Sequence, residues 1–84
     1  MLRVEAVVAL GYFHDETTRA ALLDALSDPE TLVRRKAADS LMSRRDATTV
    51  SAVRAAAQRA RGEGKLAEAT SLDQSADWIE KHAK

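Results

Sequence analysis

A sequence pattern that includes arginine, alanine and leucine recurs along this 84-residue chain at a spacing of 31 residues, without a gap. When residues 2–21 are aligned with residues 33–52, the identical pairs are Arg3/Arg34, Ala6/Ala37, Leu10/Leu41, Asp15/Asp46, Thr17/Thr48, Thr18/Thr49 and Ala21/Ala52. A repeat of this length is one supersecondary unit that stacks on its neighbours. The repeat therefore predicts an all-α chain folded as a short solenoid of antiparallel helix pairs.

The composition and the apolar periodicity both favour helices. Alanine, leucine, arginine and acidic residues are abundant, whereas the chain has three glycines and one proline. Five helices are expected. They run from Leu2 to Phe13, from a cap at Asp15 or Thr17 to Leu26, from the start signal Ser27-Asp28-Pro29 to Arg44, from the cap at Asp46 to Arg61, and from Lys65 to the last residues.

The last expected helix has two faces. Its apolar stripe contains Leu66, Ala69, Leu72, Ala76 and Ile79. The polar side chains Glu68, Asp73, Asp77, Glu80 and Lys81 are expected on the opposite, solvated face. A long final helix with a polar outer face is typical of the end of a solenoid. We therefore expect one module over residues 1–84, with an incomplete first unit at 1–14, a complete unit at 15–45, and a C-terminal unit with a capping helix at 46–84.

The segment SDPETLVRRKAADSL, residues 27–41, resembles the central motif of HEAT-like repeats, in the short form found in phycobilisome-lyase-type repeat proteins. In that family, an aspartate lies in the turn between the two helices of a unit and an arginine six positions later opens the second helix. The matching residues are Asp28 and Arg34, with Arg3 one unit earlier; the third unit has Lys65 there and lacks a clear aspartate. The resemblance implies that these residues hydrogen-bond along the stack and hold successive units in register.

The first expected helix is apolar nearly all round. Beside its main stripe it carries Val4, Val7, Val8 and Tyr12, where the next unit has Arg35, Ala38, Asp39 and Ser43. Such a helix needs other protein surfaces packed against both of its sides. The resemblance implies that its pairing helix is missing, so that the chain ends a longer array or another chain covers this surface. The alternative is that the valines only thicken the local core.

The resemblance also implies that partners bind the concave surface lined by the second helix of each unit. The predicted partner-binding residues are Val4, Glu5, Val8, Tyr12, Arg35, Lys36 and Asp39, and the surface would continue over Ala67, Thr70 and Gln74. Tyr12 is a candidate anchor, because a tyrosine buries a large apolar area and keeps a polar tip; it could equally fill the boundary between units. Arg35 and Lys36 would add selectivity for charge.

We expect no enzymatic activity, no metal and no cofactor. The chain has no glycine-rich phosphate loop, and no nucleophile with a supporting motif. It lacks cysteine, and His14 and His82 have no companion ligand spacing. The lack of cysteine leaves the compartment open, with the cytoplasm as the default expectation. No stretch is apolar for long enough to span a bilayer, so we expect no membrane contact. The favoured function is a non-catalytic interaction or scaffold module that binds a protein partner or a second copy of itself.

Two alternatives remain open. The net charge is zero, but it sums to −4 over residues 1–33, +6 over 34–65 and −2 over 66–84. The central basic band could bind a phosphate backbone; it comprises Arg34, Arg35, Lys36, Arg44, Arg45, Arg54, Arg59 and Arg61. The single Trp, Tyr and Phe argue against this, and salt bridges between units explain the band more simply. The second alternative is an accessory segment of an enzyme such as a bilin-lyase-like protein.

Overall fold

The computed structural model describes residues 16–83, and within this range the chain is helical without strands. The elements in chain order are α2 (Glu16–Ala25), α3 (Thr31–Arg44), the short 3-10 helix η1 (Ala47–Thr49), α4 (Val50–Gly62) and α5 (Leu66–His82). None of these helices is both long and apolar enough to cross a membrane. The expected first helix, with Arg3, Val4, Glu5, Val8 and Tyr12, lies outside the described residues, and so does His14.

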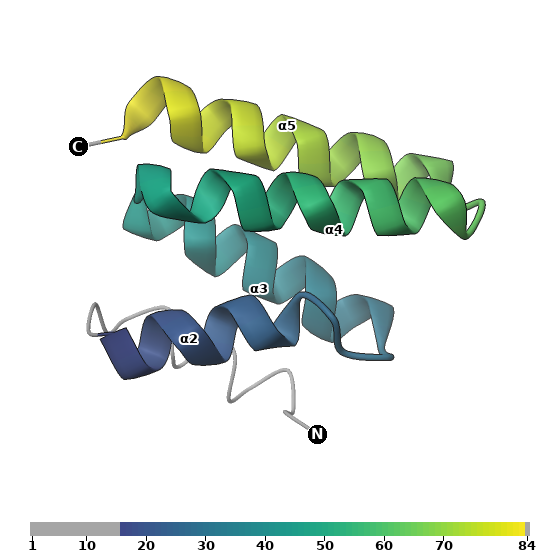
Figure 1. Ribbon diagram of the computed structural model, residues 1–84, viewed down its shortest axis with the longest axis horizontal. Helices are drawn as coiled ribbons and strands as arrows, with labels where there is room; N and C mark the ends of the chain where they lie inside the picture. The colour runs from purple at the N-terminus through teal and green to yellow at the C-terminus, as the bar shows by residue number, and fades with distance from the viewer. Residues whose placement is uncertain (1–15, 84) are drawn as a thin grey trace.

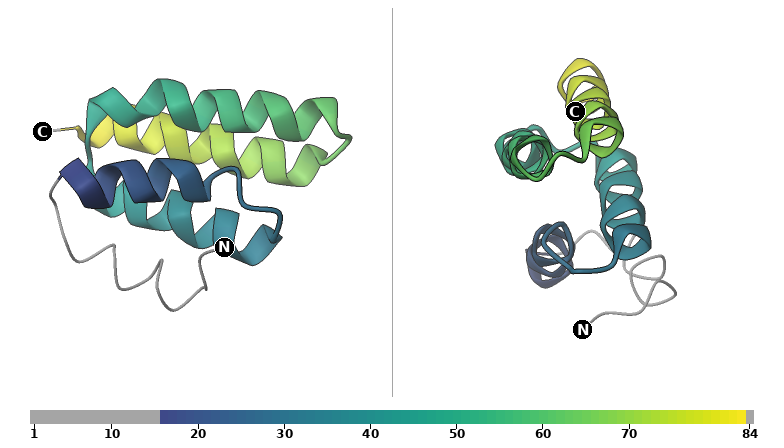
Figure 2. Two further views of the ribbon diagram at one scale, coloured as in Figure 1. Left: turned by 60° about the horizontal axis from the view of Figure 1, so that its bottom comes forward. Right: turned by 90° about the vertical axis from the view of Figure 1, so that its right-hand side faces the viewer.

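The four α-helices form two antiparallel pairs that stack side by side, α2 with α3 and α4 with α5 (Figure 1). Seen along the helices, α2 and α4 lie in one layer and α3 and α5 lie in the other (Figure 2, right). The two second helices, α3 and α5, contact each other directly. The prediction of an all-α, solenoid-like fold is therefore confirmed.

The start of α3 differs from the expectation that Pro29 lies in the first helical turn. The carboxylate of Asp28 accepts a hydrogen bond from the N–H of Glu30 at 2.9 Å, which makes a local turn across the proline. The helix begins after this turn, at Thr31, and the N–H of Arg34 bonds to the carbonyl of Glu30 at 3.2 Å. The aspartate thus satisfies a backbone donor ahead of the helix and shifts the start to Thr31.

The connection between α4 and α5 depends on Gly64. Gly64 has a φ of 79°, in the left-handed region that favours glycine. This conformation turns the chain back so that the N–H of Lys65 reaches the carbonyl of Ala60 at 2.8 Å. A 6→1 hydrogen bond with a left-handed glycine is a common way to end a helix, and it places α5 antiparallel to α4.

The core lies between the two layers and is built from small and branched apolar side chains. Its buried members are Leu22, Ala25, Leu26, Val33, Ala37, Ala38, Leu41, Val53, Ala56, Ala57, Ala60, Ala69, Leu72, Ala76 and Ile79. Leu66 was expected on the apolar stripe of the last helix, but it is 62% exposed. Because helical side chains lean toward the preceding turn, the first residue of α5 has no earlier turn of its own helix to cover.

The cap at Asp46 starts the second described unit. Its carboxylate accepts hydrogen bonds from the N–H of Thr48 at 2.9 Å and from the hydroxyl of Thr48 at 2.7 Å. The Thr49 hydroxyl donates to the carbonyl of Asp46 at 2.8 Å. These bonds hold η1 in place and lead directly into α4, so that the Asp-x-Thr-Thr sequence at residues 46–49 acts as a helix start.

Replacing Asp46 by alanine is expected to lower the free energy of unfolding by about 1 to 2 kcal/mol, the usual effect of losing an N-terminal cap. Asp46→Asn keeps an acceptor oxygen for the Thr48 N–H and should lose less. Urea unfolding followed by circular dichroism would measure both variants. Equal losses for the two variants would contradict the role of the cap.

Candidate functional site

A salt bridge with two hydrogen bonds joins the second helices of the two units, between Arg34 on α3 and Glu68 on α5. Arg34 Nε donates to Glu68 Oε2 at 2.8 Å, and Arg34 Nη2 donates to Glu68 Oε1 at 2.9 Å. The same guanidinium donates through Nη1 to the carbonyl of Asp28 at 2.8 Å and through Nη2 to the Thr31 hydroxyl at 2.9 Å. Arg34 therefore ties the turn of its own unit to the helix of the next unit.

This ion pair is largely shielded from solvent. The exposed fractions of the two side chains are 10% for Arg34 and 14% for Glu68. The hydrogen bond from Arg34 holds the pKa of Glu68 below its ordinary value, against the opposing effect of burial, with smaller contributions from Lys65 and Arg35. The same bond raises the pKa of Arg34. A two-bond arginine–carboxylate pair fixes geometry as well as charge, so it sets the offset between α3 and α5.

Asp28 and Arg34 contact each other, but not through their two side chains. Arg34 bonds to the backbone carbonyl of Asp28, while the Asp28 carboxylate bonds to Glu30. The expectation that Glu68 lies on a solvated outer face is wrong, because its carboxylate is turned toward Arg34. No signal in the sequence distinguishes Glu68 from the other carboxylates of this helix, because its partner Arg34 lies 34 residues away.

The lowered pKa of Glu68 predicts an acid-sensitive component of stability. In the unfolded chain this carboxyl titrates near its ordinary value of 4.5, whereas in the folded chain it stays ionised to lower pH. Its contribution is therefore complete well above pH 4.5 and is lost as pH falls through that value toward the folded pKa. Glu68→Gln should flatten this part of the stability profile, measured by urea unfolding at a series of pH values. A profile that keeps its full slope in the variant would contradict the assignment.

Two further contacts join the units on the side of the first helices. Arg19 of α2 donates to the hydroxyl of Thr48 at 2.9 Å and lies 3.4 Å from the Asp46 carboxylate. Arg59 of α4 donates to the hydroxyl of Ser27 at 3.1 Å, in the turn between α2 and α3. Polar contacts between units thus lie at both edges of the stack, outside the apolar core.

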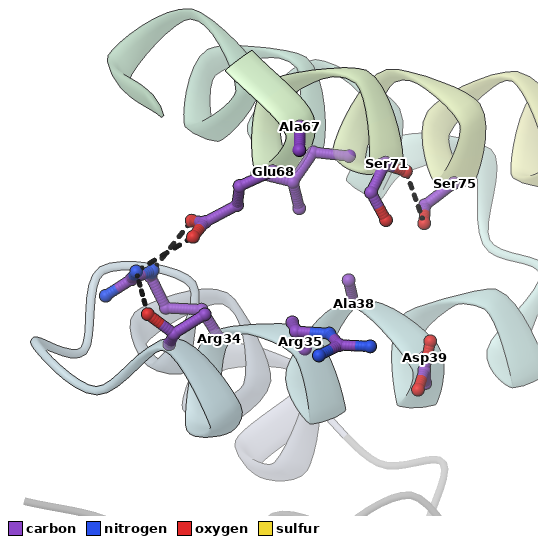
Figure 3. A pocket seen from close by; sticks show the side chains of 10 residues that line it. Arg34, Arg35, Ala38, Asp39, Ala67, Glu68, Ser71 and Ser75 are labelled. Carbon is purple, nitrogen blue, oxygen red and sulfur yellow. Dashed lines mark hydrogen bonds and ion pairs between the residues drawn. The ribbon is translucent and has the colours of Figure 1, made fainter. Parts of the chain in front are cut away.

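A groove of about 450 Å³ runs between α3 and α5, with the Arg34–Glu68 pair at one end (Figure 3). Its lining residues are Thr31, Arg34, Arg35, Ala38, Asp39, Ala67, Glu68, Ser71, Leu72 and Ser75. Arg35, Asp39 and Ala67, which the sequence places on the partner surface, all lie here and are exposed. Lys36 is half-buried and is not one of the lining residues.

The outer face of the α4–α5 pair carries charges that pair with one another. Arg54 on α4 lies 2.7 Å from Asp77 and 3.7 Å from Glu80 on α5, and Arg61 lies 2.8 Å from Asp73. These carboxylates were expected on a solvated face, and their actual partners are the arginines of α4.

One repeat earlier, the positions of Arg54 and Asp73 hold Leu23 and Met42, which pack partly buried against the core. The corresponding positions are therefore apolar in the α2–α3 pair and charged in the α4–α5 pair.

Within residues 16–83, no cluster of three or more histidine or acidic side chains could hold a metal ion. His82 stacks on Trp78 with ring centroids 4.3 Å apart, and its Nδ1 lies 2.9 Å from the Trp78 carbonyl. This histidine is therefore packed against its own helix.

A family model described as HEAT repeats matches residues 1–73. No curated protein and no solved structure matches the chain.

Proposed function

Since the chain belongs to the HEAT-repeat family, we propose that it binds a polypeptide partner in the groove between α3 and α5. HEAT repeats generally mediate protein–protein interaction or scaffolding and are typically non-catalytic. The observation that carries the proposal is the groove itself, whose lining includes the exposed side chains of Arg35, Asp39 and Ser71 and the buried side chains of Ala38 and Leu72. A volume of this size suits a few peptide side chains.

The charge pairing on the other surfaces supports the choice of this groove. The arginines on the outer face of α4–α5 already have carboxylate partners. A protein that bound there would have to break or desolvate these ion pairs, which costs free energy. The groove presents Arg35 and Asp39 without such pairing among residues 16–83. It is therefore the better docking surface in the described part of the chain.

The same pairing weakens the nucleic-acid alternative. Of the eight residues in the basic band, Arg34, Arg54 and Arg61 form ion pairs with carboxylates of α5. Binding to a phosphate backbone depends on cations that are free to replace counterions. Charges already neutralised within the protein contribute little to that exchange.

The experiment is a selection from a displayed library of random dodecapeptides on the purified full chain. Affinities of the selected peptides are then measured by fluorescence anisotropy for the wild type and for Ser71→Tyr, which fills the groove from its exposed rim. Ser51→Tyr is the matched control, because Ser51 is an exposed helical serine on α4, away from the groove. Groove binding predicts a loss of about tenfold or more for Ser71→Tyr, roughly 1.4 kcal/mol, and none for the control. Selected peptides that bind both variants like the wild type would refute the proposal.

A further inference from the structure

Building on the proposed function, we infer that the groove recognises a partner through one carboxylate side chain, an aspartate or a glutamate, which pairs with Arg35. The partner is thus a peptide segment that places one acidic residue beside Arg35, rather than a purely apolar helix. The inference concerns the chemistry of the partner, whereas the proposed function concerns only the place where it binds.

The two consecutive arginines of α3 have different surroundings. Arg34 is 8% exposed and uses its guanidinium for Glu68, for the carbonyl of Asp28 and for Thr31. Arg35 is exposed at the groove and has no ion pair or hydrogen bond with any of residues 16–83. Adjacent residues on a helix point about 100° apart, so Arg34 can be buried against Glu68 while its neighbour Arg35 is exposed at the groove. Arg34 therefore serves the fold, and no side chain of residues 16–83 pairs with Arg35 in place of a ligand.

The nearby acidic groups leave this charge available. Glu68 is already held by two bonds from Arg34 and is largely buried. Asp39 is one helical turn along α3 and is exposed, but it forms no ion pair with Arg35. A guanidinium presents parallel N–H donors that match a carboxylate in two-bond geometry, which no neutral partner group reproduces.

The rest of the groove restricts where the acid can lie. Besides Arg35 the lining includes Ala38, Ala67 and Ser71, whose short side chains leave room for a peptide to approach closely. The Asp39 carboxylate stands at the rim one turn further on and repels a second acid there. The groove therefore fits a single acidic residue beside Arg35, followed by small or hydroxyl side chains, better than it fits a run of acids.

The test uses the dodecapeptides selected on the full chain and their synthetic variants in which each acidic residue is replaced by its amide. We expect one acidic position whose replacement weakens binding about tenfold, with a weaker effect at high salt because screening reduces the attraction. In Arg35→Gln the acidic and amide peptides should bind equally. Lys36→Gln is the matched control, since it removes the neighbouring cation that does not line the groove, and it should keep the wild-type preference.

Arg35→Glu provides the converse test, because it should reverse the preference toward peptides with lysine at that position. Peptides that lose affinity in Ser71→Tyr but bind equally well as acid and amide would overturn the carboxylate inference and leave the groove as the binding site. Peptides unaffected by Ser71→Tyr would overturn the proposed function itself. A preference for acid that survives in Arg35→Gln would place the recognising cation elsewhere and would also overturn the inference.

Discussion

Glu68→Ala is expected to lower the free energy of unfolding by about 3 kcal/mol, because it leaves the buried Arg34 guanidinium without its carboxylate partner. Arg34 keeps its hydrogen bonds to the carbonyl of Asp28 and the hydroxyl of Thr31, and these bonds still stabilise part of its charge. Because the two side chains are still 10% and 14% exposed, we expect a loss of stability near the lower end of the range for breaking a buried ion pair. The predicted loss is nonetheless a large part of the stability of a small domain.

The measurement is urea unfolding of the full chain, with Glu80→Ala as the control on the same helix. Glu80 also faces an arginine, at 3.7 Å from Arg54, but its side chain is 67% exposed, so its removal should change little. The double variant Arg34→Met/Glu68→Met leaves no unpaired charge and should recover part of the loss. If Glu68→Ala costs no more than Glu80→Ala, the pair does not hold the units together.

Leu41→Ala should destabilise the chain by about 3 kcal/mol, because it removes a fully buried side chain and leaves a cavity between the layers. Leu41 is the repeat partner of Leu10 and lies on α3, which contacts both α2 and α5. The surrounding core consists largely of alanines and other short side chains. Such neighbours cannot move far enough to fill the space, so the cavity should persist.

Leu66→Ala is the matched control for this prediction, since it is the same chemical change at a position that is 62% exposed. The free energies of unfolding of the two variants, measured by thermal and urea unfolding, should differ by most of the loss predicted for Leu41→Ala. A similar loss of stability in both variants would mean that the burial of Leu41 in this structure does not stabilise the chain.

Much of the fold was predictable, because its determinants are local or periodic. The repeat predicts stacked helix pairs, and the predicted helix ends fall within two or three residues of those observed for α2 to α5. Asp46 and Gly64 lie at a cap and a turn because their own backbone and side-chain chemistry favours those places. The errors were local as well. Asp28 forms a turn before α3, and Leu66 is exposed at the first position of α5.

Less of the candidate site was predictable. The family resemblance pointed to Arg35 and Asp39 as partner-binding residues, and both lie in the groove. It pointed equally to Lys36, which does not line it. The partner of Arg34 was not predictable, since the sequence places Glu68 among several solvated carboxylates. The members of the acidic face look alike in the sequence, and only the rotation of α5 against α3 and α4 separates Glu68 from Asp73 and Asp77.

The sequence by itself determined the helices, their order and their stacking, because a 31-residue period of apolar positions and caps requires each unit to cover the next. The tertiary structure decided what each charge does. Arg34 and Arg35 are neighbours with the same side chain, yet one is held by Glu68 and the other faces the groove. The reason is geometric. Ion pairs between units depend on the offset and rotation of packed helices, and these are fixed by core packing over many residues rather than by the local sequence around any charge.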